Sequence, residues 1–135
     1  MSFPAQRLHA YRAALEALVA FVPLAESWPR GWADLRDQGK RAATSAVLNI
    51  AEGASLPPGG RAKGRHFAIA LGSLGEVAAV LDAASALKLG NSPQVDELQA
   101  MVERAGALVG GLLRRAEGRQ APSPATSGTN QIKKC

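Results

Sequence analysis

The 135-residue sequence contains a single cysteine, and this is its last residue, Cys135. One cysteine excludes an internal disulfide and a cysteine-based metal cluster, and it suits a reducing compartment. Aromatic residues are also scarce, at 4%, whereas apolar residues make up 47% of the chain. A core of this composition is built from Leu, Val, Ile and Ala, and the small side chains allow helix axes to approach closely.

Long apolar runs are missing as well. No segment approaches the ~18 uninterrupted apolar residues of a transmembrane helix. The N-terminal segment MSFPAQRLHAYR has no apolar run of the kind that a secretory signal contains. We therefore expect a cytoplasmic protein with one domain and no membrane association.

Catalytic and metal-binding patterns are not evident. His9 and His66 are too far apart for a helical ligand pair, and the sequence has no Glu-x-x-His motif. The acidic candidates Glu52 and Glu76 are not expected to meet when their helices pair. No glycine loop follows a strand, and no serine lies in a nucleophile elbow. The sequence predicts a protein that is not an enzyme and has no metal site and no cofactor.

Four segments carry apolar residues at three- and four-residue spacing, and none alternates as a strand does. The predicted helices run from about Ala5 to Glu26, from Trp32 or Ala33 to Ala54, from Arg61 to Leu87, and from Pro93 to Glu117. Short loops between them predict an all-α, up-down-up-down antiparallel four-helix bundle over residues 1–117. Residues 118–135 are rich in Ser, Pro and Thr, which predicts a disordered tail.

The spacing also predicts which residues face the core. In the first helix the predicted inward residues are Leu8, Tyr11, Leu15, Leu18, Val19 and Val22. In the third helix Ile69 is expected to widen a face that is buried on two sides. Pro23 is expected to kink the first helix or to open one of its hydrogen bonds. Ser92 is expected to cap the start of the fourth helix.

Sixteen Lys and Arg residues against eleven Asp and Glu give a net charge of +5. The antiparallel topology brings the starts of the first and third helices to the same pole as the ends of the other two. The basic residues at this pole are Arg7, Arg12, Arg61, Lys63, Arg65, Arg114, Arg115 and Arg119, against Glu52 and Glu117. The opposite pole mixes both signs. A polarised basic surface predicts that this pole binds nucleic acid.

Two similar polar pairs interrupt the apolar helices, Asn49 with Glu52 and Ser73 with Glu76. A three-residue spacing puts both members of a pair on one helical face. Such groups either fix helix register and subunit pairing or contact a partner, and the sequence leaves both open. Gly72, beside Ser73, permits another backbone to approach. We predict that Asn49, Glu52, Gly72, Ser73 and Glu76 form a helix-packing or subunit interface.

The words "NIAEG" and "IALGSLGE" resemble those of the four-helix-bundle proteins encoded within intervening sequences of bacterial large-subunit ribosomal RNA. The resemblance covers roughly Leu8 to Leu89 and includes the turn Trp28-Pro29-Arg30. Pro23, five residues before that turn, is also similar to the first helix of the accessory variability determinants of diversity-generating retroelements, which belong to the same superfamily. The resemblance is incomplete, because Val47 stands where the family often has Pro.

The resemblance implies a homopentameric ring of four-helix protomers without catalytic activity. For the retroelement branch it also implies binding to a reverse transcriptase and its RNA. Together with the charge pattern, it leads us to expect a non-enzymatic oligomer that binds RNA or another nucleic acid through its basic pole. The alternative is a structural adaptor or scaffold that recognises only protein and has no nucleic-acid role.

Overall fold

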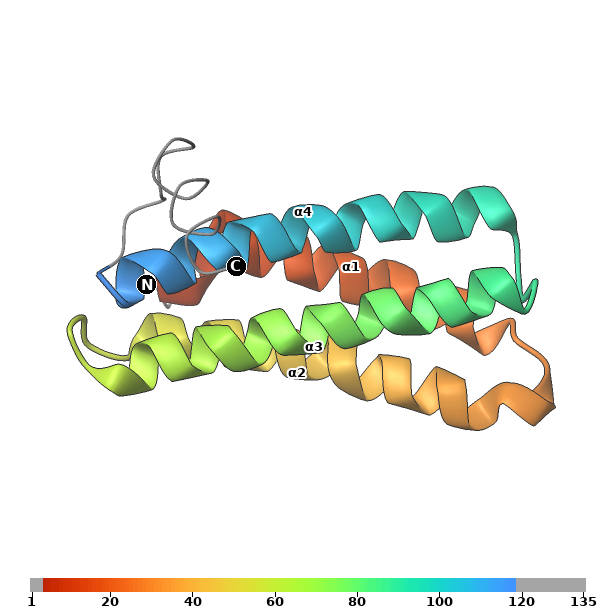
Figure 1. The fold of residues 1–135 in the computed structure, drawn as a ribbon, viewed down its shortest axis with the longest axis horizontal. Helices are drawn as coiled ribbons and strands as arrows, with labels where there is room; N and C mark the ends of the chain where they lie inside the picture. The colour runs from red at the N-terminus through yellow and green to blue at the C-terminus, as the bar shows by residue number, and fades with distance from the viewer. Residues whose placement is uncertain (1–3, 119–135) are drawn as a thin grey trace, which may run out of the picture.

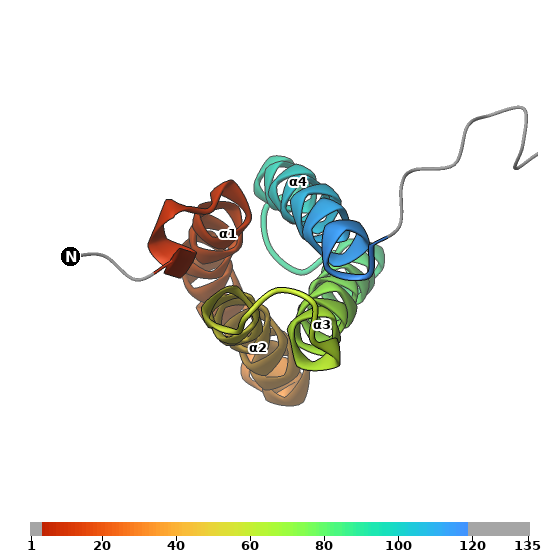
Figure 2. The ribbon, with the colours of Figure 1, turned by 90° about the vertical axis from the view of Figure 1, so that its left-hand side faces the viewer.

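The protein is a bundle of four α-helices. The structure is a computed structural model that describes residues 4–118, with only the backbone of Gln6 and Arg7. The helices are α1 (His9–Glu26), α2 (Ala33–Ser55), α3 (Arg61–Ala86) and α4 (Ser92–Ala116), with short 3-10 helices η1 (Pro4–Arg7) and η2 (Arg30–Trp32). Each α-helix packs against the next, and α4 returns to pack on α1 (Figures 1 and 2). The predicted up-down-up-down bundle is confirmed.

Two helix starts differ from those that we predicted. The first segment does not form one helix from Ala5, because Leu8 is extended (φ −86°, ψ 133°) and separates η1 from α1. The N-cap of α4 is Asn91 rather than Ser92, and its side chain accepts a hydrogen bond from the backbone N–H of Gln94. An Asn side chain satisfies one of the free N–H groups of a first turn as well as a Ser does. The predicted tail began at residue 118, and residues 119–135 of it lie outside the described residues.

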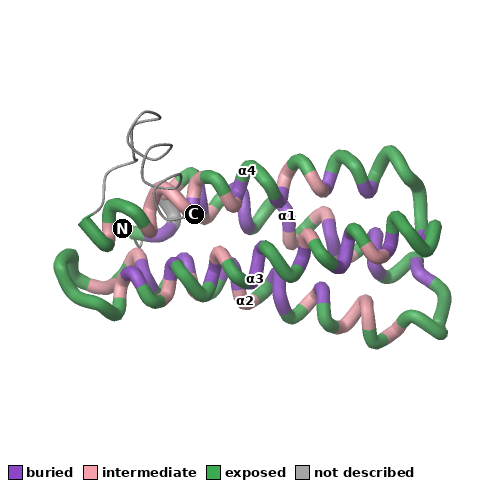
Figure 3. Tube along the Cα trace, in the orientation of Figure 1, coloured by how far each residue is buried: buried purple, intermediate pink, exposed green. Residues whose placement is uncertain are grey.

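Alanine lines the inner side of α1, so part of the predicted apolar stripe was wrong. Leu15 is 38% exposed and Val19 is 66% exposed, whereas Ala14 and Ala17 are almost fully buried. Apolar residues surround most of α1, so spacing alone did not determine which stripe faces inward. The close packing of helices favours the small residues. Ile69 of α3 is likewise 43% exposed, and Figure 3 shows buried positions along the inner sides of all four helices.

Two phenylalanines pack against glycines in α2 and fix the spacing of the helices. A Cβ on Gly53 would lie 2.7 Å from Cε1 of Phe67, and a Cβ on Gly39 would overlap the ring of Phe21. Phe21 also meets Trp28 edge to face, with ring centroids 5.9 Å apart. Both phenylalanines are fully or almost fully buried. Phe21 and Phe67 therefore fill the core where glycine leaves room for a ring.

By length and composition alone, α3 could cross a membrane. Within the bundle, 44% of its most apolar window is buried, and α3 packs between α2 and α4. One such helix is weak evidence for a membrane span, because the core helix of a bundle has the same composition.

Candidate functional site

The starts of α1 and α3 and the ends of α2 and α4 meet at one pole of the bundle (Figure 2). Five exposed arginines lie at this pole. They are Arg12, Arg61, Arg65, Arg114 and Arg115. Among the described residues, none of these five guanidinium groups forms an ion pair. Of the other predicted members, Arg7 has no described side chain and Arg119 lies outside the described residues.

Lys63 lies at the same pole but has a different role from the one that we predicted for it. Its Nζ donates to the carbonyl oxygens of Gly53 at 2.6 Å and Leu56 at 2.8 Å, and it lies 3.4 Å from that of Ala54. It also lies 5.6 Å from the centroid of the Phe67 ring. The last carbonyls of a helix have no partner within that helix. Lys63 therefore caps the C-terminus of α2 and joins it to α3.

The start of α3 has the charge pattern that suits an anion. Its N-cap is Gly60, which offers no side-chain cap, and the first turn holds no acidic residue. The partial positive charge of a helix N-terminus favours acidic residues or a bound anion, but Arg61 and Arg65 occupy this region instead. A hollow of about 470 Å³ lies here between α3 and α4, lined in part by both arginines and by Glu117.

Four of the charges at the opposite pole are paired with one another. Glu26 accepts a hydrogen bond from Lys40 at 2.7 Å and lies 3.9 Å from Arg36, which itself pairs with Asp37. The hydrogen bond and the charge of Lys40 lower the pKa of Glu26 below its ordinary value of 4.5. Arg30 and Arg41 at the opposite pole are also exposed and form no ion pair among the described residues, but the exposed Asp34, Asp96 and Glu97 balance their charge. The first pole differs in its excess of unpaired arginines.

A chain of polar contacts ties α2 to α3. Ser73 Oγ donates to Ser45 Oγ at 3.0 Å, and Asn49 Nδ2 lies 3.2 Å from the same oxygen. Asn49 Nδ2 also donates to the Ser45 carbonyl at 2.9 Å, so its Oδ1 faces Nδ1 of His66, 2.9 Å away. The other ring nitrogen, Nε2, lies 3.4 Å from Glu52. The chain runs from the buried Ser73 to the exposed Glu52.

This polar chain positions helices and does not assemble a nucleophile. The two ring nitrogens of His66 face an amide and a carboxylate, so neither faces a hydroxyl that it could activate. No group of three or more potential metal ligands occurs in the part of the chain that the structure describes. Sequence reasoning treated His66 as isolated. The loop between α2 and α3 could have revealed this contact. Counting residues away from the loop along both helices places His66 beside Asn49.

The remaining predicted interface residues lie on the outside of α3. Glu76 and Gly72 are exposed, and nothing lies within 4 Å of the position that a Cβ on Gly72 would occupy. Within one chain, no other helix therefore packs closely against Gly72. The nearby Ile69 in α3 and Leu48 in α2 are also exposed, at 43% and 58%. The surface formed by Leu48, Ile69 and Gly72, which we call the α2–α3 face, is partly apolar and open.

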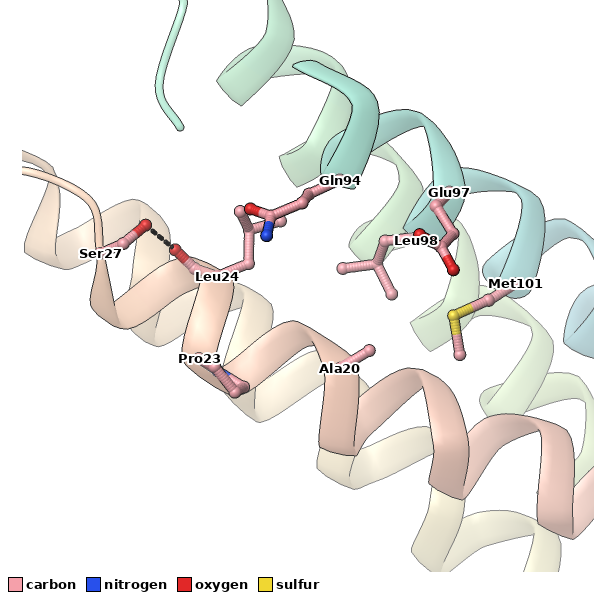
Figure 4. A pocket seen from close by; sticks show the side chains of 8 residues that line it. All are labelled: Ala20, Pro23, Leu24, Ser27, Gln94, Glu97, Leu98 and Met101. Carbon is pink, nitrogen blue, oxygen red and sulfur yellow. Dashed lines mark hydrogen bonds between the residues drawn. The ribbon is translucent and has the colours of Figure 1, made fainter. Parts of the chain in front are cut away.

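A groove of about 400 Å³ separates α1 from α4 near the opposite pole, where α1 ends and α4 begins (Figure 4). Ala20 and Leu24 of α1 face Leu98 and Met101 of α4 across it, and Glu97 lies along its edge. In the cyclic order of the helices, the pair α1 and α4 lies opposite the pair α2 and α3 (Figure 2). The bundle thus has two different apolar surfaces on opposite sides.

These features define an all-α antiparallel bundle with a basic pole and a polar contact chain between α2 and α3. The profile of the family described as 23S rRNA-intervening sequence protein matches residues 6–111, and the chain belongs to this family. The resemblance inferred from "NIAEG" and "IALGSLGE" is thereby confirmed for the ribosomal branch. A search of curated proteins found no match.

Proposed function

We propose that this protein is a non-enzymatic oligomer that binds RNA through the phosphate backbone at its basic pole. The observation that carries the proposal is the group of five exposed arginines that have no ion-pair partner among the described residues. Arginines spread over three helix ends suit an extended polyanion better than a single small anion. The family's name, which refers to ribosomal RNA intervening sequences, is consistent with this reading.

Retention of a labelled RNA during a salt titration tests the proposal. Because binding would release counterions, log K should fall linearly with log salt, by about 0.7 per contacted phosphate for a single strand. Replacing Arg61, Arg65, Arg114 and Arg115 together with Gln should abolish retention at ~50 mM salt and flatten the slope. A matched variant with Arg30, Arg36, Arg41 and Lys88 replaced by Gln removes the same number of charges from the other pole and should bind as the wild type does. Absence of retention by the wild-type protein at that salt would overturn the proposal.

The two apolar surfaces support assembly through unlike contacts. The α2–α3 face of one copy would pack into the groove between α1 and α4 of the next copy, and repeated head-to-tail contacts close into a ring when the rotation fits. We propose that the ring contains five copies, as the family resemblance implies. Light scattering tests it, because a mass near the 14.0 kDa of one chain contradicts assembly.

A finer proposal is that the protein serves a reverse transcriptase as the accessory subunit of a diversity-generating retroelement. Its support is the similarity of Pro23, five residues before Trp28-Pro29-Arg30, to the first helix of that branch. A neighbouring reverse-transcriptase gene with a template repeat would favour this role, and a neighbourhood without either would count against it.

The second candidate function is that of an adaptor or scaffold that recognises only protein. The groove between α1 and α4 favours it, because an apolar floor with a polar edge suits a partner helix (Figure 4). A stoichiometric protein partner that survives nuclease treatment during purification would support this function over the first.

We also propose a cytoplasmic location without membrane association, which fractionation of cells would test.

A further inference from the structure

A small pocket opens at the basic pole, between the end of α4, the α2–α3 loop and the segment that precedes α1. Its volume is about 270 Å³, and its lining includes Leu8, Ala54, Phe67, Leu112, Arg115 and Ala116. The lining is therefore mostly apolar, although five exposed arginines surround this end of the bundle. An apolar pocket within a basic surface calls for a ligand that is apolar in one part and anionic in another.

The contacts of Lys63 hold the pocket in shape. Its ammonium group donates to the carbonyls of Gly53 and Leu56, which holds the end of α2 and the start of the loop against α3. Phe67, which lines the pocket, packs so closely on Gly53 that a Cβ on this glycine would overlap the ring. Walls that are fixed before binding reduce the entropy lost when a ligand enters.

The size and chemistry of the pocket limit what it can accept. Pockets for drug-sized ligands begin at about 300 Å³, so this one suits a single compact group. Among the residues that the structure describes, its lining contains no carboxylate, hydroxyl or amide side chain that could read the edge of a particular base. The charged groups in the lining are Lys63, whose ammonium is already used, and Arg115, which is exposed and has no ion pair among the described residues.

We propose that the pocket takes one unpaired base of a single RNA strand, with the neighbouring phosphates on Arg115 and Arg114. This inference rests on the proposed function, since it requires RNA at the basic pole. A base in a duplex is stacked and paired, and removing it from the stack has an energetic cost. The protein therefore prefers single strands to duplexes, and it does so with little preference for base identity.

The experiment compares three ligands at one salt concentration: a single-stranded oligouridylate, an oligomer of the same length with abasic sites throughout, and a duplex. The abasic strand keeps every phosphate but has no base. The wild-type protein should bind the oligouridylate roughly tenfold more tightly than the abasic strand, because only a strand with bases can bury apolar surface in the pocket. Ala116→Leu, which fills the pocket, should remove this difference and leave abasic binding unchanged. Ala107→Leu, on the exposed side of the same helix, is the matched control and should keep it.

The outcomes separate this inference from the function on which it depends. Equal binding of the oligouridylate and the abasic strand by the wild-type protein would overturn the base pocket and leave phosphate binding in place. Binding of neither strand at ~50 mM salt would overturn the proposed function and the pocket with it. The wild-type comparison needs no substitution, so it holds even where Ala116→Leu disturbs folding.

Discussion

The ammonium group of Lys63 lies 2.6 Å from the carbonyl oxygen of Gly53, ten positions earlier in the chain. The contact joins the last turn of α2 to the first turn of α3, across the loop that leads to the basic pole. It explains how a basic residue can lie beside the candidate RNA surface and still serve the fold.

Replacing Lys63 with Met keeps the apolar stem and removes the ammonium group. The carbonyls of Gly53 and Leu56 then lose a charged donor, so the free energy of unfolding should fall by ~1–3 kcal/mol. Urea unfolding at a fixed protein concentration measures this change. Arg61→Met, on the exposed start of the same helix, should stay within about 0.5 kcal/mol of the wild type. If the two variants are equally stable, Lys63 does not act as a cap.

The hydrogen bond between Asn49 and His66 should appear as an energetic coupling. Asn49→Ala and His66→Ala should each destabilise the protein by ~1–2 kcal/mol, because each leaves a partly buried partner without its hydrogen bond. The double variant should lose less than the sum of both, by at least ~0.5 kcal/mol, as contacting residues do. Thr44→Ala is the control, since the Thr44 hydroxyl bonds only within α2. Additive losses for Asn49 and His66 would contradict the contact.

The sequence patterns predicted the helices better than their orientations and contacts. Gly and Pro marked the loop between α2 and α3 because these residues disfavour continued helix. Leu15 and Val19 were assigned to the core, but the close approach of helices buries alanines in their place. Lys63 was counted among free charges because its partners depend on the path of the loop. The α2–α3 pairing that brings His66 to Asn49 follows from tertiary register, which local spacing does not report.

Glu26 gives the fold a weak dependence on pH. Its pKa is lowered by the hydrogen bond from Lys40 and by the Lys40 charge, so the ionised form stabilises the folded state. This contribution is present above pH 4.5 and is lost as the pH falls through the lower pKa of the folded protein. The melting temperature of the wild type should exceed that of Glu26→Gln at pH 6 and converge with it near pH 3.

The carboxylate of Glu26 is exposed, so the effect should be small and should shrink in ~1 M salt. NMR titration of the side-chain carboxyl gives a direct measurement. Its midpoint should lie below 4.5 in the wild type and move upward in Lys40→Met. A wild-type midpoint at or above 4.5 would show that the Lys40 contact does not form in solution.

Gly39 should tolerate no larger side chain. Gly→Ala in a helix interior usually stabilises a protein by ~1 kcal/mol, but a Cβ on Gly39 would overlap the ring of Phe21. Because this ring is fully buried, we expect Gly39→Ala to destabilise the protein by ~1–3 kcal/mol. Gly75→Ala is the control, with nothing within 4 Å of its Cβ position, and it should be neutral or stabilising. Thermal melts that move both variants in the same direction would refute the close contact.

A substitution at Gly72 should affect the assembly of subunits without affecting the fold of one chain. Nothing lies within 4 Å of its Cβ position in the protomer, so Gly72→Leu should leave the helical circular dichroism and the fold of the protomer intact. A copy that packs on the α2–α3 face would meet the new side chain, and light scattering should then give a mass closer to 14.0 kDa. Ala107→Leu on α4 adds a side chain of the same size away from that face and should keep the wild-type mass. If Gly72→Leu also keeps it, subunits assemble through another surface, and the exposed Leu48 and Ile69 need a different partner.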